Sequence, residues 1–223
     1  RSTNTDWYSG SSLLEILEAI PNRSAESTTG SFSVQYPISD TGSLYGGRIL
    51  SGSLQAGDSL THVPSLKKVV VSGLSLANEQ FIQATAPFSI NIEVSAGFPI
   101  NRGDLLLKKE EALTLCTSAK ATLCWLDESP LIAGRSYLFQ QNAKVAECTI
   151  TSIESLLDVR TNKSQPATSQ ELQQNNIATV TILFFEPLYL ERYTDSRLLG
   201  SGIIIDPTTN ATAGAILIED LTR

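Results

Sequence analysis

Residues 45–60 read Tyr45-Gly46-Gly47-Arg48-Ile49-Leu50-Ser51-Gly52-Ser53-Leu54-Gln55-Ala56-Gly57-Asp58-Ser59-Leu60, and Val63-Pro64 follows shortly. The apolar residues form two short runs that meet at Gly52 and continue across Ala56-Gly57-Asp58. Glycine at such a point permits backbone angles that other residues avoid, and an aspartate can hydrogen-bond its own turn. This pattern predicts a hairpin of a small β-barrel.

From Phe32 onward, short segments alternate apolar and polar residues and are separated by Gly, Pro, Asn and Asp, which is typical of β-strands. The segments that we expect to be strands are residues 31–36, 67–74, 86–94, 119–126, 135–141, 144–153, 176–185, 202–206 and 211–218. The pair Gly103-Asp104 before three leucines repeats the pair Gly57-Asp58 before Ser59-Leu60. Such a repeat is expected where strands turn around a small barrel.

The strand pattern predicts an all-β chain with two consecutive small antiparallel β-barrels, preceded by one short helix. We place a linker and the helix in residues 1–29, the first barrel in residues 30–111 and the second barrel in residues 112–223. Residues 161–175 are polar and contain Pro166. We interpret them as a long exposed loop with one helical turn at residues 169–173.

The predicted helix carries an apolar stripe. Ser12 and Glu15 have the spacing of a capping box, and Pro21 ends the helical pattern. Such a stripe needs a surface to cover it, which is either a domain upstream of Arg1 or the first barrel. The chain contains no methionine, so we expect a further segment before Arg1. The residues of this candidate interface are Trp7, Tyr8, Leu13, Ile16, Leu17 and Ile20.

The composition excludes several classes of protein. With 41% hydrophobic and 17% charged residues, the 223-residue chain is too apolar for disorder, and no apolar run approaches the roughly 18 residues of a transmembrane helix. The net charge of −7 is spread along the chain, which disfavours binding to nucleic acid. Three cysteines, Cys116, Cys124 and Cys148, sit in strand-like patterns. Their odd number favours free thiols and the cytoplasm.

We find no convincing catalytic or metal-binding motif. Asp40-Thr41-Gly42 spells an aspartic-protease signature, but such an enzyme needs a second copy, so a single-motif protease is a remote alternative. His62 is the one histidine, and the cysteine spacings do not match zinc sites. We therefore interpret His62 as a structural strand residue, and we assign no catalytic, cofactor-binding or metal-ligating residue.

Several short motifs, in order and with consistent spacing, resemble the GTPase (large) subunit of sulfate adenylyltransferase. They are Trp7-Tyr8-x-Gly10 before Leu13-Leu14-Glu15, Val34-Gln35, Ser51-Gly52 through Gly57-Asp58, Arg102-Gly103-Asp104-Leu105-Leu106, Ala121 to Trp125 before Pro130-Leu131, Asn176-Ile177, Glu186-Pro187, and Gly202 to Asp206 before Thr209-Asn210. The resemblance implies two barrels like domains II and III of elongation factor Tu. It also implies an upstream GTPase domain that binds GTP and Mg²⁺, and a small adenylyltransferase subunit that uses ATP and sulfate to make adenylyl sulfate.

The nucleotide-binding motifs of that family are not found in this sequence. A phosphate-binding loop needs glycines followed by Lys and Ser or Thr, and the sequence contains no Gly-Lys pair. Asn162-Lys163 is followed by Ser164-Gln165 instead of the x-Asp that reads guanine. We therefore expect no enzymatic activity from this chain alone, and a role in docking and coupling its partners. The alternative within the same fold is the barrel pair of a translation GTPase that binds RNA or the ribosome.

Overall fold

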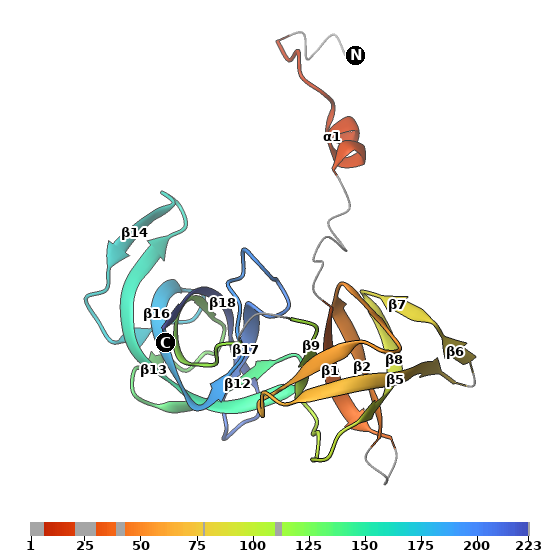
Figure 1. Ribbon diagram of the computed structural model, residues 1–223. Coiled ribbons are helices and arrows are strands. Elements are labelled where there is room, and N and C mark those ends of the chain that lie inside the picture. Colours follow the sequence, from red (N-terminus) through yellow and green to blue (C-terminus); the bar gives the residue numbers. More distant parts are fainter. Residues whose placement is uncertain (1–6, 21–29, 39–42, 78, 110–112, 223) are drawn as a thin grey trace.

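The computed structural model describes residues 7–20, 30–38, 43–77, 79–109 and 113–222, and Figure 1 shows two barrels that follow one another along the chain. The first barrel is built from β1 (Ser31–Pro37), β2 (Leu44–Ser51), β4 (Ser59–Val63), β5 (Lys68–Leu76), β8 (Phe88–Ser95) and β9 (Leu105–Leu107). These strands pair in the order β4-β9-β1-β2-β8-β5, and pairing of β5 with β4 closes the sheet. β6 (Glu79–Phe81) pairs with one end of β5, and β3 (Ser53–Gln55) pairs with β7 (Gln83–Thr85).

The second barrel closes in the same way. Its strands are β10 (Cys116–Trp125), β12 (Ser136–Gln141), β13 (Lys144–Asp158), β16 (Ile177–Leu188), β17 (Ser201–Ile205) and β18 (Thr212–Thr222). They pair in the order β12-β17-β18-β10-β16-β13, and β13 pairs back to β12. β14 (Lys163–Pro166) pairs with the end of β13, and β11 (Leu131–Ile132) pairs with β15 (Glu171–Leu172). The predicted all-β fold of two antiparallel barrels is confirmed.

Each barrel has its own apolar core, because alternate residues of its longer strands point inward. In β10, for example, Ala121, Leu123 and Trp125 are all buried. The Trp125 ring meets Tyr137 from β12 edge to face, with 5.5 Å between the ring centroids. Burial of such side chains is the main source of stability, at about 25 cal/mol per Å² of apolar surface.

The prediction of a hairpin at residues 45–60 is wrong in its strand pairing. Strands and a turn form where expected, but β2 pairs with β1 and β8, whereas β4 pairs with β5 and β9. Gly52, at a φ of 62°, ends β2, and the short strand that follows pairs with β7. The chain therefore crosses between different parts of the barrel instead of folding back on itself.

The prediction of a loop at residues 161–175 is also wrong. β13 continues to Asp158, turns at residues 159–162 with Asn162 at a φ of 53°, and pairs with β14. All four residues of β14 are exposed. The polar composition of this segment therefore reflects a hairpin that extends beyond the barrel and meets solvent. Residues 169–173 form no helical turn, because β15 begins at Glu171.

The short helix forms as predicted. α1 (Leu13–Ala19) begins after Ser12, whose hydroxyl accepts a hydrogen bond from the Glu15 N–H at 3.2 Å, while the Glu15 carboxylate accepts from the Ser12 N–H at 2.6 Å. This reciprocal capping box satisfies N–H groups that the first helical turn leaves unpaired. Among the described residues, no helix has the length and hydrophobicity needed to cross a bilayer.

Candidate functional site

The apolar stripe of α1 is exposed to solvent. No residue of the helix is buried, and Trp7, Leu13 and Leu17 expose 82%, 73% and 57% of their surface. Figure 1 shows α1 standing apart from both barrels. Of the two surfaces considered for this stripe, the first barrel does not cover it in this structure. Its role as an interface stays a prediction.

The chemically reactive residues do not gather into one site. His62 is buried on β4, where Nε2 lies 2.8 Å from Asp104 Oδ2 and Nδ1 lies 2.7 Å from Ser65 Oγ. It is a hydrogen-bonded core histidine, as interpreted from the sequence. Within the described ranges, no group of three or more His, Cys, Asp or Glu side chains could hold a metal ion. The Asp40-Thr41-Gly42 motif lies outside the described residues.

None of the three cysteines forms a disulfide, and they lie in different environments. Cys116 and Cys148 are buried and Cys124 is half-buried. Burial raises the pKa of the Cys148 thiol to about 12, because the thiolate would lose its hydration in the apolar core. Cys148 is therefore a core residue and a poor nucleophile.

The two Gly-Asp turns of the first barrel share one geometry. Gly57 and Gly103 both have a φ of 91°. In the first turn, the Asp58 carboxylate accepts a hydrogen bond from the N–H of Gln55 at 2.9 Å. In the second, the Asp104 carboxylate accepts one from the N–H of Asn101 at 2.8 Å. The repeat predicted from the sequence is thus present in the hydrogen bonds themselves.

The two barrels meet through a small apolar cluster. It combines four residues of the first barrel with two of the segment that leads from β16 to β17 in the second barrel, namely Leu50, Val63, Leu105, Leu107, Tyr189 and Leu199. The Tyr189 hydroxyl donates to the Glu191 carboxylate at 2.6 Å and accepts from Lys109 Nζ at 3.3 Å. Burial, together with the bond to Glu191, raises the pKa of Tyr189, so the phenol stays protonated and can keep donating.

Gly103 lies where the two barrels approach each other closely. A Cβ atom built on this glycine would be 2.7 Å from the Cα of Lys144 and 3.0 Å from the carbonyl oxygen of Ala143. Both neighbours belong to the second barrel, at the tip of the β12–β13 hairpin. A side chain at position 103 would therefore separate the two barrels at this point.

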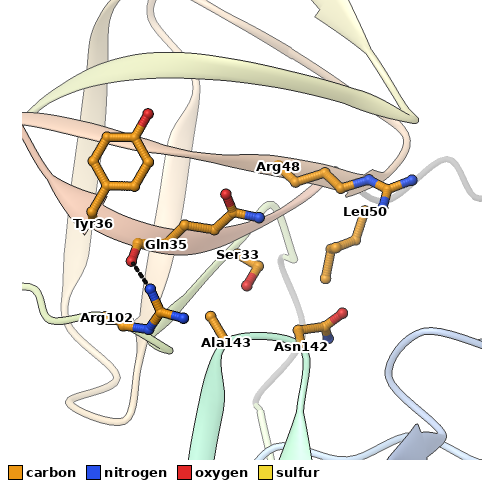
Figure 2. Close-up of a pocket in the computed structure, with 8 residues that line it drawn as sticks. All are labelled: Ser33, Gln35, Tyr36, Arg48, Leu50, Arg102, Asn142 and Ala143. Atoms are coloured by element: carbon orange, nitrogen blue, oxygen red, sulfur yellow. Dashed lines mark hydrogen bonds between the residues drawn. The ribbon is translucent and has the colours of Figure 1, made fainter.

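Next to this contact, a groove of about 380 Å³ opens between the barrels. Figure 2 shows Ser33 near its centre, with Arg48 and Arg102 on the side of the first barrel. Asn142 and Ala143, at the tip of the β12–β13 hairpin, form the opposite wall. The groove therefore exists because the two barrels are held in this arrangement.

The groove is lined with donors of hydrogen bonds. Arg102 donates to the backbone carbonyl of Gln35 at 3.2 Å, and both Arg48 and Arg102 are exposed. Neither arginine forms an ion pair with a described carboxylate. The hydroxyl of Ser33 is buried and has no hydrogen-bond partner among the described residues. Sequence reasoning missed this group, because its members are far apart in the chain and match no motif.

Comparisons with known proteins agree with this fold. The family described as "GTP-eEF1A C-terminal domain-like" matches residues 118–219, which lie in the second barrel. The chain is 31% identical to sulfate adenylyltransferase subunit 1 of Alteromonas mediterranea over 99% of its length. It is 32% identical to the same subunit of Shewanella oneidensis over 97% of its length.

The chain is similar to a region of sulfate adenylyltransferase subunit 1. The resemblance inferred from the short motifs is confirmed. The chain spans about half the length of these relatives, 47% of the Alteromonas protein and 46% of the Shewanella protein. The similarity therefore concerns a region of the subunit, and this region contains both barrels.

Solved structures of sup35 share this architecture. A crystal structure of sup35 complexed with GDP superposes with a TM-score of 0.82 over 97% of this chain and 53% of that chain. The sequence identity is 18%. This likeness establishes the fold, including the arrangement of two barrels in series.

Proposed function

We propose that this chain is the non-catalytic two-barrel region of the GTPase subunit of a sulfate adenylyltransferase. In this proposal, it docks a GTP-binding domain and couples it to the small adenylyltransferase subunit. GTP and Mg²⁺ bind that domain, ATP binds the small subunit, and the complex works in the cytoplasm. The supporting observation is similarity to subunit 1 proteins over nearly the whole chain.

The contact between the barrels supports a coupling role. Coupling requires that a displacement at one partner reaches the other, so the connecting body must be stiff. Leu105 and Leu107 of the first barrel pack with Tyr189 and Leu199 of the second in one buried cluster. Gly103 adds a contact between backbones, which leaves little space for sliding. Two closed barrels joined in this way would move as one unit.

The helix α1 supplies a surface for the GTP-binding domain. It exposes Leu13, Ile16 and Leu17 on one face, and exposed apolar faces of this kind are typical of protein interfaces. A short helix also gains most of its stability from packing against a partner. We therefore assign the stripe to the GTP-binding domain and the barrels to the small subunit.

The proposal is tested by mixing the chain with the small subunit and with the GTP-binding domain as separate polypeptides. Size-exclusion chromatography with light scattering then reports which complexes form. We expect the chain to bind both partners at once. Leu13→Asp combined with Leu17→Asp should abolish binding of the GTP-binding domain and leave binding of the small subunit intact. Glu18→Gln, an exposed change on the same helix, is the matched control and should bind both.

Two outcomes contradict this proposal. The first is failure of the chain to bind either partner. The second is binding to RNA or ribosomes that persists at physiological salt, which would favour the translation GTPase alternative. The net charge of −7 argues against that alternative, because most of the surface would repel a phosphate backbone.

A further inference from the structure

We propose that the groove between the barrels binds a small tetrahedral oxyanion, a phosphate or sulfate group, through Arg48, Arg102 and Ser33. The anion is either free or the terminal group of a small molecule. This site is independent of the docking role proposed above. Three observations carry the proposal: the charge of the groove, an unpartnered buried hydroxyl and the shape of the groove.

The first observation is the charge of the groove. Arg48 from β2 and Arg102 from the turn before β9 both line it, in a chain whose net charge is −7. Arg135, Arg160 and Arg192 instead form ion pairs with described carboxylates, for example Arg135 with Asp206 at 2.7 Å. No described acidic residue lines the groove. Two guanidinium groups without a carboxylate partner attract an anion and offer planar forks of N–H donors to its oxygens.

The second observation is the hydroxyl of Ser33. This side chain is 2% exposed, and its Oγ has no partner among the described residues. Buried hydroxyls are normally hydrogen-bonded, because burial without a partner costs free energy. Ser31, two residues earlier on the same strand and equally buried, follows this rule, since its Oγ lies 2.7 Å from Ser51 Oγ. An oxyanion in the groove would accept a hydrogen bond from Ser33 and satisfy it.

The third observation is the shape of the groove. Its volume of about 380 Å³ lies within the range of small-molecule sites, roughly 300–1,000 Å³. The Asn142–Ala143 tip of the second barrel faces Ser33 and Arg102 across the groove, as Figure 2 shows. Asn142 has a φ of 51° and donates its side-chain amide to the Leu198 carbonyl at 3.1 Å, which fixes this wall. The site is therefore enclosed on both sides and can accept an anion with a small attached group.

The experiment is isothermal titration calorimetry of the chain with sodium sulfate, sodium phosphate and ADP, at constant ionic strength maintained with sodium chloride. We expect saturable binding of at least one of these probes. Tighter binding of ADP than of phosphate would identify an anion carried by a small molecule, and equal or weaker binding of ADP would identify a free anion. The probes are used at low millimolar concentrations, because concentrated sulfate and phosphate stabilise folded proteins without binding a specific site.

Variants distinguish this site from general surface charge. Arg48→Gln and Arg102→Gln should each weaken binding about tenfold, since a hydrogen bond to a charged group is lost, and the double variant should show none. Arg160→Gln removes the same charge from an arginine whose side chain is 89% exposed and does not line the groove. It should bind like the unmodified chain.

Ser33→Ala provides a readout that does not depend on arginine. It removes the unpaired hydroxyl, so the thermal unfolding midpoint without anion should stay the same or rise, while anion binding weakens about fivefold. The proposal is overturned if no probe binds above the chloride background. It is equally overturned if the Arg48→Gln and Arg102→Gln double variant binds as well as Arg160→Gln.

Discussion

His62 and Asp104 meet inside the first barrel, with Nε2 of the histidine 2.8 Å from Oδ2 of the aspartate and both side chains less than 10% exposed. A second pair mirrors this one, since Lys108 Nζ lies 2.7 Å from Asp58 Oδ1. Each aspartate thus contacts the residue four positions after the other aspartate. The antiparallel pairing of β4 with β9 produces this exchange, because His62 is opposite Leu106. The aspartate of each Gly-Asp turn thus binds a side chain on, or directly after, the strand that follows the other turn.

The first prediction concerns Asp104. Asp104→Ala leaves the buried His62 and the N–H of Asn101 without their acceptor. We expect the free energy of unfolding to fall by about 2–4 kcal/mol, which is the usual cost of breaking a buried hydrogen-bonded pair. Urea unfolding followed by far-ultraviolet circular dichroism, which reports the strands of both barrels, measures it. Glu147→Ala, at an exposed position of β13, should change stability little, and an equal loss in both variants would refute the role of the pair.

The second prediction compares two glycines with the same backbone angle. Gly57→Ala and Gly103→Ala both place a side chain at a φ of 91°, which costs roughly 1–2 kcal/mol. A Cβ at position 57 meets no atom within 4 Å, whereas one at position 103 is 2.7 Å from Lys144 Cα. We expect Gly103→Ala to be the more destabilising by about 1–3 kcal/mol, owing to overpacking. Equal chemical unfolding midpoints would show that the barrels do not need this close contact.

The third prediction concerns thiol reactivity. In the native protein at pH 8, a disulfide reagent should modify Cys124, which is half-buried, and leave Cys116 and Cys148 unmodified. Burial raises the pKa of Cys148 to about 12, so almost no thiolate is present. All three cysteines should react in denaturant. Cys124→Ser should eliminate the native reaction, and a residual fast phase in that variant would contradict the burial of the other two.

The fourth prediction concerns pH. Hydrogen bonds from the backbone N–H groups of Thr208 and Thr209, and the charge of Arg135, lower the pKa of Asp206. A carboxyl group with a lowered pKa stabilises the folded state above its unfolded pKa, near 4, and this contribution disappears as the pH falls through the folded value. Asp206→Asn should therefore be less stable than the unmodified chain at pH 7, and the difference should shrink below about pH 4.

The measurement for Asp206 is the urea midpoint of both proteins between pH 7 and pH 3. Asp195→Asn, which removes a carboxylate from an exposed loop, is the control and should show little difference at any pH. A difference between Asp206→Asn and the unmodified chain that persists unchanged at pH 3 would mean that ionisation of Asp206 is not its cause.

Local patterns predicted the strands well, whereas pairing depended on distant parts of the chain. The alternation in residues 119–126 and 176–185 predicted β10 and β16, because one face of each strand is buried in the second barrel. The turn at Gly57 was also correctly located. Its strands were assigned to a hairpin because sequence shows where a chain turns and not which strand it joins. In a closed barrel, β4 finds its partner β9 more than 40 residues away.

Composition misled the prediction at residues 161–175. Polar residues usually indicate a loop, but β14 is a strand that is exposed on every residue and therefore needs no apolar face. The groove was beyond sequence analysis for a related reason. Ser33, Arg48, Arg102 and Asn142 come from separate segments and two barrels, and an unpaired hydroxyl becomes visible only when the surrounding atoms are placed.

The open end of the second sheet has a consequence for behaviour at high concentration. β14 is the last strand of this sheet, so the backbone N–H and C=O groups on its side away from β13 form an edge. Such an edge can pair with a strand of another molecule and start fibril growth. Pro166 has no N–H to offer an incoming strand, and Lys163 adds a charge that repels a second copy. The projecting hairpin thus carries its own protection against self-association.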